Sequence, residues 1–203
     1  MACKSSNEAV EERKLTKYRV NPGGAAITAF SAAYLVFVPV TSYLARTGVL
    51  GSLTEGVARF VPGYTVGSGR TIPALSMMYI FWTFGASGAI SAAGQAMARA
   101  EGLDNEHPRK HVNEMEGLPL RMRSAHYGLL ENFGGFALAA ALAQVLAPNN
   151  QEIINLLGYH VIAKMFIYYP AYLLNIAPPR TLSHLTATAA VINVCWKLAS
   201  GAR

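Results

Sequence analysis

RMRSAHYGLLENFGGF, residues 121–136, contains polar and charged side chains that are unusual for an apolar segment. Arg121 and Arg123 stand at its start, and His126, Glu131 and Asn132 follow within an apolar run that continues as FALAAALAQVLA. Removing an ionised carboxylate from water without a partner costs several kcal/mol. The stretch therefore predicts a membrane helix in which Glu131 faces other helices instead of lipid. Glu131 is either a ligand-binding or subunit-interface group or one half of a structural ion pair.

The composition extends this interpretation to the whole chain. It has 203 residues, of which 52% are hydrophobic and only 14% charged, whereas about a quarter of a soluble domain is charged. Apolar stretches of roughly 20 residues separate the charged regions, and such a length crosses about 30 Å of hydrocarbon as a helix. The pattern predicts an all-α integral membrane bundle. The net charge of +6 then indicates basic loops beside anionic lipid and predicts no nucleic-acid partner.

The apolar stretches predict membrane spans at residues 24–45, 73–98, 125–147, 153–176 and 182–199. A short interfacial helix is expected at Leu53–Phe60, in the connection 46–72. Basic residues concentrate at positions 4–19 and 99–123. The positive-inside rule places both regions on the cytoplasmic side, which requires an even number of crossings between them. We therefore expect a multi-pass protein whose N-terminus is cytoplasmic.

Two basic side chains inside or beside the later spans are candidates for binding. Lys164 lies too deep in the fourth span to reach water easily. Its natural partner is Glu131, because residues 148–151 allow only a tight turn between the two helices. Lys164 thus forms either a salt bridge or an anion site. Arg180 follows Pro178 and Pro179 and is either a carboxylate clamp or an ordinary interfacial arginine.

The remaining candidates are aromatic. Tyr168, Tyr169 and Tyr172 are either interfacial anchors or include one hydroxyl that donates to a thiolate. His160 and His184 are expected to be packing residues. The sequence contains no zinc-ligand motif, P-loop or dinucleotide fingerprint, and its two cysteines have no metal-ligand spacing. No metal site is predicted.

Several motifs, taken in order and spacing, resemble those of the MAPEG family of membrane-associated enzymes of eicosanoid and glutathione metabolism. They are GLDNEHPR at 102–109, LRMRSAHYGLLENF at 120–133 and AYLLNIAPPRTL at 171–182. The resemblance covers residues 77–203 and implies a four-helix protomer and a homotrimer in the endoplasmic reticulum or another intracellular membrane. It also implies glutathione bound between subunits as its thiolate. The chain would then comprise a cytoplasmic polar tail (1–23), an extra N-terminal transmembrane helix with its connecting loop (24–72), and the four-helix transmembrane domain (73–203).

Carried over by position, the resemblance implies two catalytic residues, Arg180 and Tyr168, which would lower the pKa of the glutathione thiol. It implies that glutathione, as co-substrate, is bound by Arg123, His126, Glu131, Lys164, Tyr172 and Arg180. Lys164 falls at a family arginine if one residue is shifted before Arg180; in the other register Met165 falls there.

The departures from the family keep two functions open. Gly128 stands where the family has an asparagine whose amide is expected to contact glutathione, and Gly134 and Gly135 replace a usual proline. The first function is a glutathione-dependent transferase or peroxidase acting on lipophilic electrophiles or lipid hydroperoxides. The alternative is a non-catalytic membrane scaffold that has kept the fold and lost glutathione.

Overall fold

The computed structural model describes residues 23–201, with the side chains of residues 28–201. Its helices are α2 (Gly23–Ala45), α3 (Gly48–Ala58), α4 (Thr71–Ile80), α5 (Ser87–Met97), α6 (Gly117–Leu146), α7 (Gln151–Ile162), α8 (Tyr169–Leu173) and α9 (Ala177–Ala199). The π-helical segments η1 (Phe81–Ala86) and η3 (Ala163–Tyr168) join α4 to α5 and α7 to α8, and η2 (Val112–Glu114) is a 3-10 turn. The predicted polar tail, residues 1–23, lies outside the described residues except for Gly23.

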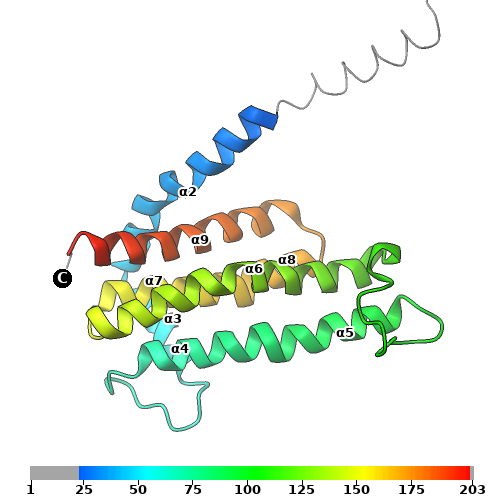
Figure 1. Ribbon diagram of the computed structural model, residues 1–203. Helices are drawn as coiled ribbons and strands as arrows, with labels where there is room; N and C mark the ends of the chain where they lie inside the picture. The colour runs from blue at the N-terminus through cyan, green and yellow to red at the C-terminus, as the bar shows by residue number, and fades with distance from the viewer. Residues whose placement is uncertain (1–22, 202–203) are drawn as a thin grey trace, which may run out of the picture.

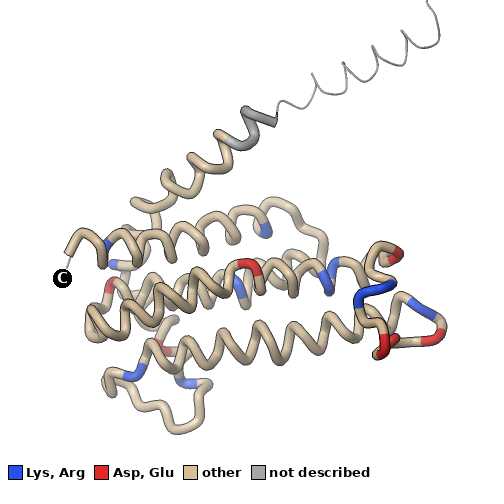
Figure 2. The backbone as a smooth tube through the Cα atoms, viewed as in Figure 1, with Lys and Arg blue, Asp and Glu red and all other residues tan. Residues whose placement is uncertain are grey.

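The helices form the all-α bundle that the sequence predicts, with α2 and the short α3 preceding its other helices (Figure 1). The rod α4–η1–α5, then α6, α7–η3–α8 and α9 run along one another, and α2 crosses α9 obliquely (Figure 1). We call the end that contains residues 98–116 and the α8–α9 connection the loop end. The opposite end, with residues 59–70 and 147–150, is the turn end. Figure 2 shows charged residues gathered at these ends and sparse between them.

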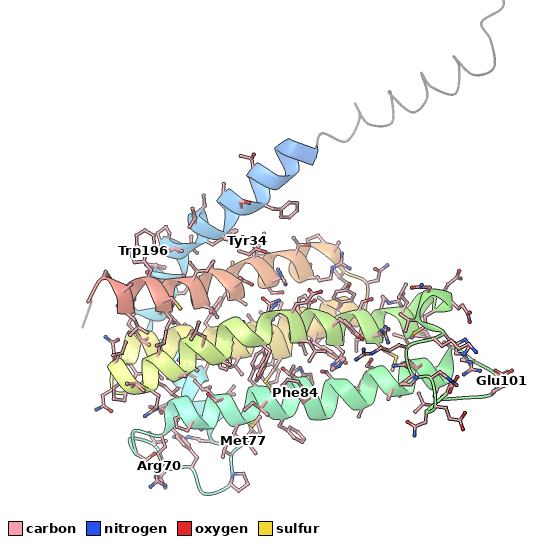
Figure 3. The ribbon with its side chains drawn as sticks, viewed as in Figure 1. Tyr34, Arg70, Met77, Phe84, Glu101 and Trp196 are labelled. Atoms are coloured by element: carbon pink, nitrogen blue, oxygen red, sulfur yellow. The ribbon has the colours of Figure 1, made fainter. Side chains whose placement is uncertain are left out.

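Large apolar side chains remain exposed along the sides of the bundle, as expected for contact with hydrocarbon. On the rod α4–η1–α5, Met77 points away from the other helices (Figure 3). Met77 is 46% exposed, and Phe84, whose ring also meets Phe133 of α6 edge-on, is 53% exposed. Thr28–Ala45 and Gly117–Leu146 are each long and apolar enough to span a membrane. The fold is therefore that of an integral membrane helical bundle.

The observed helix boundaries correct several predicted ones. Helix α6 already begins at Gly117, so part of the predicted polar loop 99–123 is helical. Helix α3 begins at Gly48 instead of Leu53 because Thr47 caps it by accepting from Leu50 N. The last helix begins at Ala177 instead of Leu182, since prolines fit the first turn of a helix, where no intrahelical N–H partner is needed.

The centre of the bundle is an aromatic cluster between α4, α6 and α7. Tyr79 meets Phe136 edge-on, with ring centroids 4.7 Å apart, and Phe136 stacks on His160 at 5.1 Å. All three side chains are at most 1% exposed. His160 Nδ1–H donates to Ala187 O at 2.9 Å, since a carbonyl can only accept. His160 is thus a packing residue, as predicted, and links α7 to α9.

Two buried asparagines attach α2 to the rest of the bundle. Asn193 on α9 lies within hydrogen-bonding distance of Val38 O, Thr41 Oγ1 and Ser42 Oγ, at 3.2, 3.1 and 2.8 Å. Asn155 on α7 donates to Ala45 O at 2.7 Å. Buried amides need such partners, particularly in a bilayer. They therefore fix where α2 lies on α7 and α9.

An ion-pair cluster at the turn end strengthens the same attachment. Glu152 Oε1, in the first turn of α7, lies 3.1 Å from Arg46 Nε and 3.0 Å from Lys197 Nζ. Arg46 follows α2 and Lys197 belongs to the last turn of α9. One carboxylate thereby joins the ends of three helices.

Replacing Asn193 should loosen α2 without unfolding the bundle. Asn193→Leu removes hydrogen bonds that average about 0.6 kcal/mol and reach ~1.7 kcal/mol each inside membrane proteins. We expect a lower thermal unfolding midpoint and faster hydrogen–deuterium exchange confined to residues 28–45. The exposed Asn113 offers a matched Asn113→Leu control. Unchanged exchange in α2 would show that these hydrogen bonds do not hold it.

Candidate functional site

A groove of about 420 Å³ opens on the surface between α6 and the η3–α8 segment. We call it the α6 groove; the polar or small residues that line it are Arg123, Ser124, Tyr127, Gly128, Glu131, Tyr168 and Tyr172. Four of the predicted site residues thus come together here: Arg123, Glu131, Tyr168 and Tyr172.

Arg123 is held at the wall of the α6 groove by Tyr127, one helical turn further along. Its guanidinium donates to the Tyr127 hydroxyl at 3.0 Å and lies 4.5 Å from the centroid of that ring. Tyr127 was not among the predicted site residues, although its four-residue spacing from an arginine indicates a shared helix face. Arg121 is already occupied, because its Nε donates to Leu173 O at 2.9 Å.

Glu131 and Asn132 are neighbours in sequence but have different surroundings. Asn132 Nδ2 donates to Gly128 O at 2.9 Å, and its Oδ1 accepts from Thr188 Oγ1 at 2.8 Å. This amide joins α6 to α9. Glu131 is exposed in the α6 groove and forms no ion pair with any residue from 28 to 201. Its carboxylate is available to a ligand or to another subunit.

Gly128 gives Tyr168 the space it occupies. A Cβ atom at Gly128 would overlap the Tyr168 hydroxyl and lie 3.1 Å from its Cζ. The hydroxyl therefore fills the position from which a larger side chain at residue 128 would extend. Tyr168 is only 4% exposed, and its ring meets Tyr172 edge-on at 5.6 Å.

Lys164 lies behind Tyr168 and is completely buried. Its Nζ is 3.0 Å from Nδ1 of His184 on α9 and 4.3 Å from the centroid of the Tyr168 ring. The predicted ion pair with Glu131 is wrong within the described structure. The π-helical segment η3 directs Lys164 toward α9, whereas Glu131 lies on the exposed surface of α6.

A second groove, of about 280 Å³, lies on the other side of the same tyrosines, between α2 and α9. We call it the α9 groove; it is lined by Phe30, Tyr34, Tyr168, Tyr172, Arg180, Thr181, His184 and Leu185. The Arg180 guanidinium stacks over the Tyr172 ring, 4.8 Å from its centroid. Arg180 forms no ion pair among the described side chains.

The α8–α9 connection brings Arg180 to this place. Asn175 ends α8 in the left-handed region, with φ of 58°, a conformation that asparagine tolerates better than most residues. Ile176 N then donates back to Ala171 O at 2.9 Å, which reverses the chain. Arg180 consequently sits in the first turn of α9, near Tyr172 on α8.

Like the buried Lys164, the predicted site residue His126 lines neither groove. Its Nδ1 lies 2.9 Å from Ser87 Oγ on α5. Because Ser87 Oγ donates its single proton to Thr83 O at 2.7 Å, His126 Nδ1–H is the donor to Ser87. His126 thereby connects α5 to α6.

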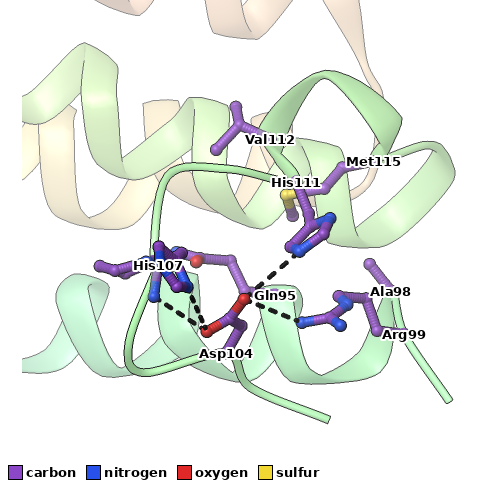
Figure 4. Close-up of a pocket in the computed structure, with 9 residues that line it drawn as sticks. Gln95, Ala98, Arg99, Asp104, His107, His111, Val112 and Met115 are labelled. Atoms are coloured by element: carbon purple, nitrogen blue, oxygen red, sulfur yellow. Dashed lines mark hydrogen bonds and ion pairs between the residues drawn. The ribbon is translucent and has the colours of Figure 1, made fainter. Parts of the chain in front are cut away.

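Asp104 organises a separate cluster at the loop end (Figure 4). It accepts from His107 N at 2.9 Å and lies 3.3 Å from His111 Nε2 and 3.7 Å from Arg99. The His107 backbone hydrogen bond, reinforced by these neighbouring basic groups, lowers the pKa of Asp104. The cluster encloses only about 20 Å³, so it orders the loop and offers little room for a ligand.

No group of three or more His, Cys, Asp or Glu side chains in residues 28–201 is placed to hold a metal ion. The polar groups that line the two grooves are mainly tyrosine and charged side chains.

The fold and the two grooves define the class of protein: it is a helical membrane protein that carries charged and tyrosine side chains in the half of the bundle nearest the loop end. The chain belongs to the MAPEG family: the model of that family matches residues 72–200. No curated protein and no solved structure matches it. The family match begins after α2 and α3, whose residues precede it.

Enlarging Gly128 should destabilise the protein through Tyr168. Gly128→Ala forces the Tyr168 hydroxyl aside, and overpacking of this kind costs about 1–3 kcal/mol. Adding Tyr168→Phe removes the overlapping hydroxyl and should restore most of the loss in the thermal unfolding midpoint. Gly134→Ala is the matched control, because nothing lies within 4 Å of a Cβ there. Equal effects of Gly128→Ala with and without Tyr168→Phe would refute the contact.

The Asp104 cluster should lose its effect on stability in acid. Because the pKa of Asp104 is lowered by folding, its stabilisation is complete above the ordinary aspartate pKa of about 3.9 and disappears as pH falls through the lowered value. Unfolding midpoints measured from pH 6 to pH 2.5 should therefore fall more steeply for the wild type than for Asp104→Asn. Glu106→Gln, at an exposed position, should behave like the wild type. Parallel curves for the wild type and Asp104→Asn would contradict this linkage.

Proposed function

We propose that the protein is a glutathione-dependent transferase or peroxidase that acts on lipophilic electrophiles or lipid hydroperoxides. The observation that carries the proposal is the arrangement of two grooves on either side of Tyr168 and Tyr172. One contains Arg123 and the unpaired carboxylate of Glu131, and the other contains the unpaired guanidinium of Arg180. Membership of the MAPEG family, whose members generally use glutathione, supports the choice of thiol.

The charges of the grooves complement those of glutathione. Its ammonium group would pair with Glu131, a carboxylate would accept hydrogen bonds from Arg123 in the bidentate geometry that guanidinium favours, and Arg180 would bind its thiolate. Lys164 is buried behind Tyr168, so it would contribute its charge without direct contact. Tyr172 would hold Arg180 in place through their stacked arrangement.

The thiolate would be the nucleophile in both reactions. Arg180 and a hydrogen bond from the Tyr168 hydroxyl would stabilise the thiolate, and the thiol proton would leave to water in the open groove. In conjugation, the sulfur forms a bond to the electrophilic carbon while the leaving group departs with the electron pair of its own bond. With a hydroperoxide, the sulfur attacks the outer oxygen and the O–O bond breaks. The products are a sulfenic acid and an alkoxide, which takes a proton from water to become an alcohol. A second glutathione converts the sulfenic acid to disulfide and water.

We further propose a homotrimer that crosses the membrane of the endoplasmic reticulum or another intracellular membrane several times. Its N-terminus and loop end would lie on the cytoplasmic side. Two observations support this. Basic residues concentrate at the loop end, in residues 99–123. Glu131 is exposed on the protomer surface, where contact with lipid would be costly and a second subunit or a hydrated groove would relieve that cost. The division of the chain at residues 72 and 73 is part of the same proposal.

One observation favours the alternative, a membrane scaffold without glutathione. The Tyr168 hydroxyl fills the space beside Gly128 where an asparagine side chain is expected from the family resemblance. Either the hydroxyl substitutes for that amide as a polar contact to glutathione, or the contact has been lost. Binding measurements separate the two functions directly.

Glutathione binding should depend on the two unpaired charges. Equilibrium dialysis of the detergent-purified protein should give saturable binding that Glu131→Gln and Arg180→Gln each weaken at least about tenfold, since each leaves a ligand charge unpaired and such pairs contribute ~1.5–3 kcal/mol. Glu116→Gln, an exposed carboxylate outside both grooves, should leave binding unchanged. Absence of binding by the wild type at millimolar glutathione, with a folded protein, would favour the scaffold.

A further inference from the structure

Helix α2 lies outside the residues that match the family, yet two of its side chains line the α9 groove. Phe30 and Tyr34 are four positions apart in the sequence and therefore share one face of α2. They lie in the same groove as Arg180, Thr181 and Leu185 of α9. Figure 3 shows Tyr34 on the part of α2 that passes beside α9. The extra helix thus forms one wall of a groove whose other wall holds a predicted catalytic residue.

The lining of the α9 groove combines an apolar surface with a cation. Phe30, Tyr34 and Leu185 offer aromatic and aliphatic surface, and Phe30 is 53% exposed. Arg180 offers a guanidinium that stacks on Tyr172 and has no acidic partner among the described side chains. An apolar surface next to an unpaired cation complements an amphiphile with a long apolar chain and an anionic or oxygenated end.

The α9 groove also adjoins the place where a thiol would be held. Tyr168 and Tyr172 line both grooves. A polar end lying at Arg180 would therefore be near a thiolate stabilised by Tyr168, while the apolar chain extends along α2. The substrate and the thiolate could therefore meet without any movement of the helices.

We propose that α2 provides the binding wall for the lipophilic substrate, and that the substrate is a long-chain amphiphile whose polar end lies at Arg180. Phe30 and Tyr34 contact its apolar chain and so determine which substrates are accepted. The reaction rests on the proposed glutathione-dependent function, but occupancy of the groove by an acyl chain does not require glutathione and is tested separately.

The test is photolabelling of the full chain in phosphatidylcholine nanodiscs. The probe is stearic acid with a diazirine at mid-chain, and labelled residues are located by mass spectrometry. We expect labels near residues 30–34 of α2 and near Leu185 of α9, competed by unlabelled stearic acid. In the Phe30→Ala, Tyr34→Ala double variant, the concentration of stearic acid needed to compete should rise about tenfold, since apolar contact area is lost.

The matched control is the Leu35→Ala, Val36→Ala double variant. These side chains are 58% and 64% exposed on the same helix and do not line the α9 groove. Their removal should leave the labelling and its competition unchanged. Labels spread evenly over the lipid-facing helices, or equal effects of the two double variants, would overturn the proposal.

Glutathione dialysis on the same preparations distinguishes the two proposals. If the Phe30→Ala, Tyr34→Ala variant binds glutathione like the wild type but loses stearate competition, α2 contributes to binding of the lipophilic substrate and not of glutathione. If the wild type binds no glutathione but labels at the groove, the proposed reaction fails and the groove remains an acyl-chain site. Retained folding is checked by the unfolding midpoint of each variant.

Discussion

Tyr168 reaches α6 because Gly128 leaves room for its hydroxyl. This contact places a tyrosine between two grooves and buries Lys164 behind its ring. It occurs at the end of η3, a π-helical segment; single turns of π-helix inside longer helices are frequent at functional sites. Hydrogen bonds in a π-helix span one residue more than those in an α-helix, which changes the direction of the side chains that follow. Tyr168, the last residue of this segment, lines both grooves.

The rest of the bundle depends on polar groups that are satisfied across helices. Asn193 and Asn155 hold α2, Asn132 joins α6 to Thr188, and His160 joins α7 to α9. In an apolar environment each such group has few alternative partners, so these contacts specify which helices are neighbours. Glu131 and Arg180 differ from these groups, because each lines a groove and has no oppositely charged partner among the described side chains.

Much of the candidate site can be expected from isolated residues, but the partners of those residues cannot. The cost of burying charge is enough to mark Glu131, Lys164 and Arg180 as exceptional in the sequence. The same reasoning wrongly pairs Lys164 with Glu131. A short turn implies that two helices are adjacent, but it does not say which of their side chains meet. His184 is the observed partner, since side-chain direction depends on helix rotation, which the π-helical segment alters. Tyr127, Phe30 and Tyr34 carry no comparable signal, because aromatic residues are common in any membrane helix.

The all-α membrane bundle, the approximate position of its long helices and the family of the protein were all predictable from the amino-acid sequence. These properties depend on the length of apolar segments, the distribution of charge and short motifs, all of which can be recognised from residues close together in the sequence. The tertiary structure was needed to show that α2 packs against α9 and borders the α9 groove, and that His126 faces Ser87 instead of either groove. Such contacts join residues far apart in sequence and depend on how each helix is rotated and shifted against its neighbours. The periodicity of a single helix does not contain that information.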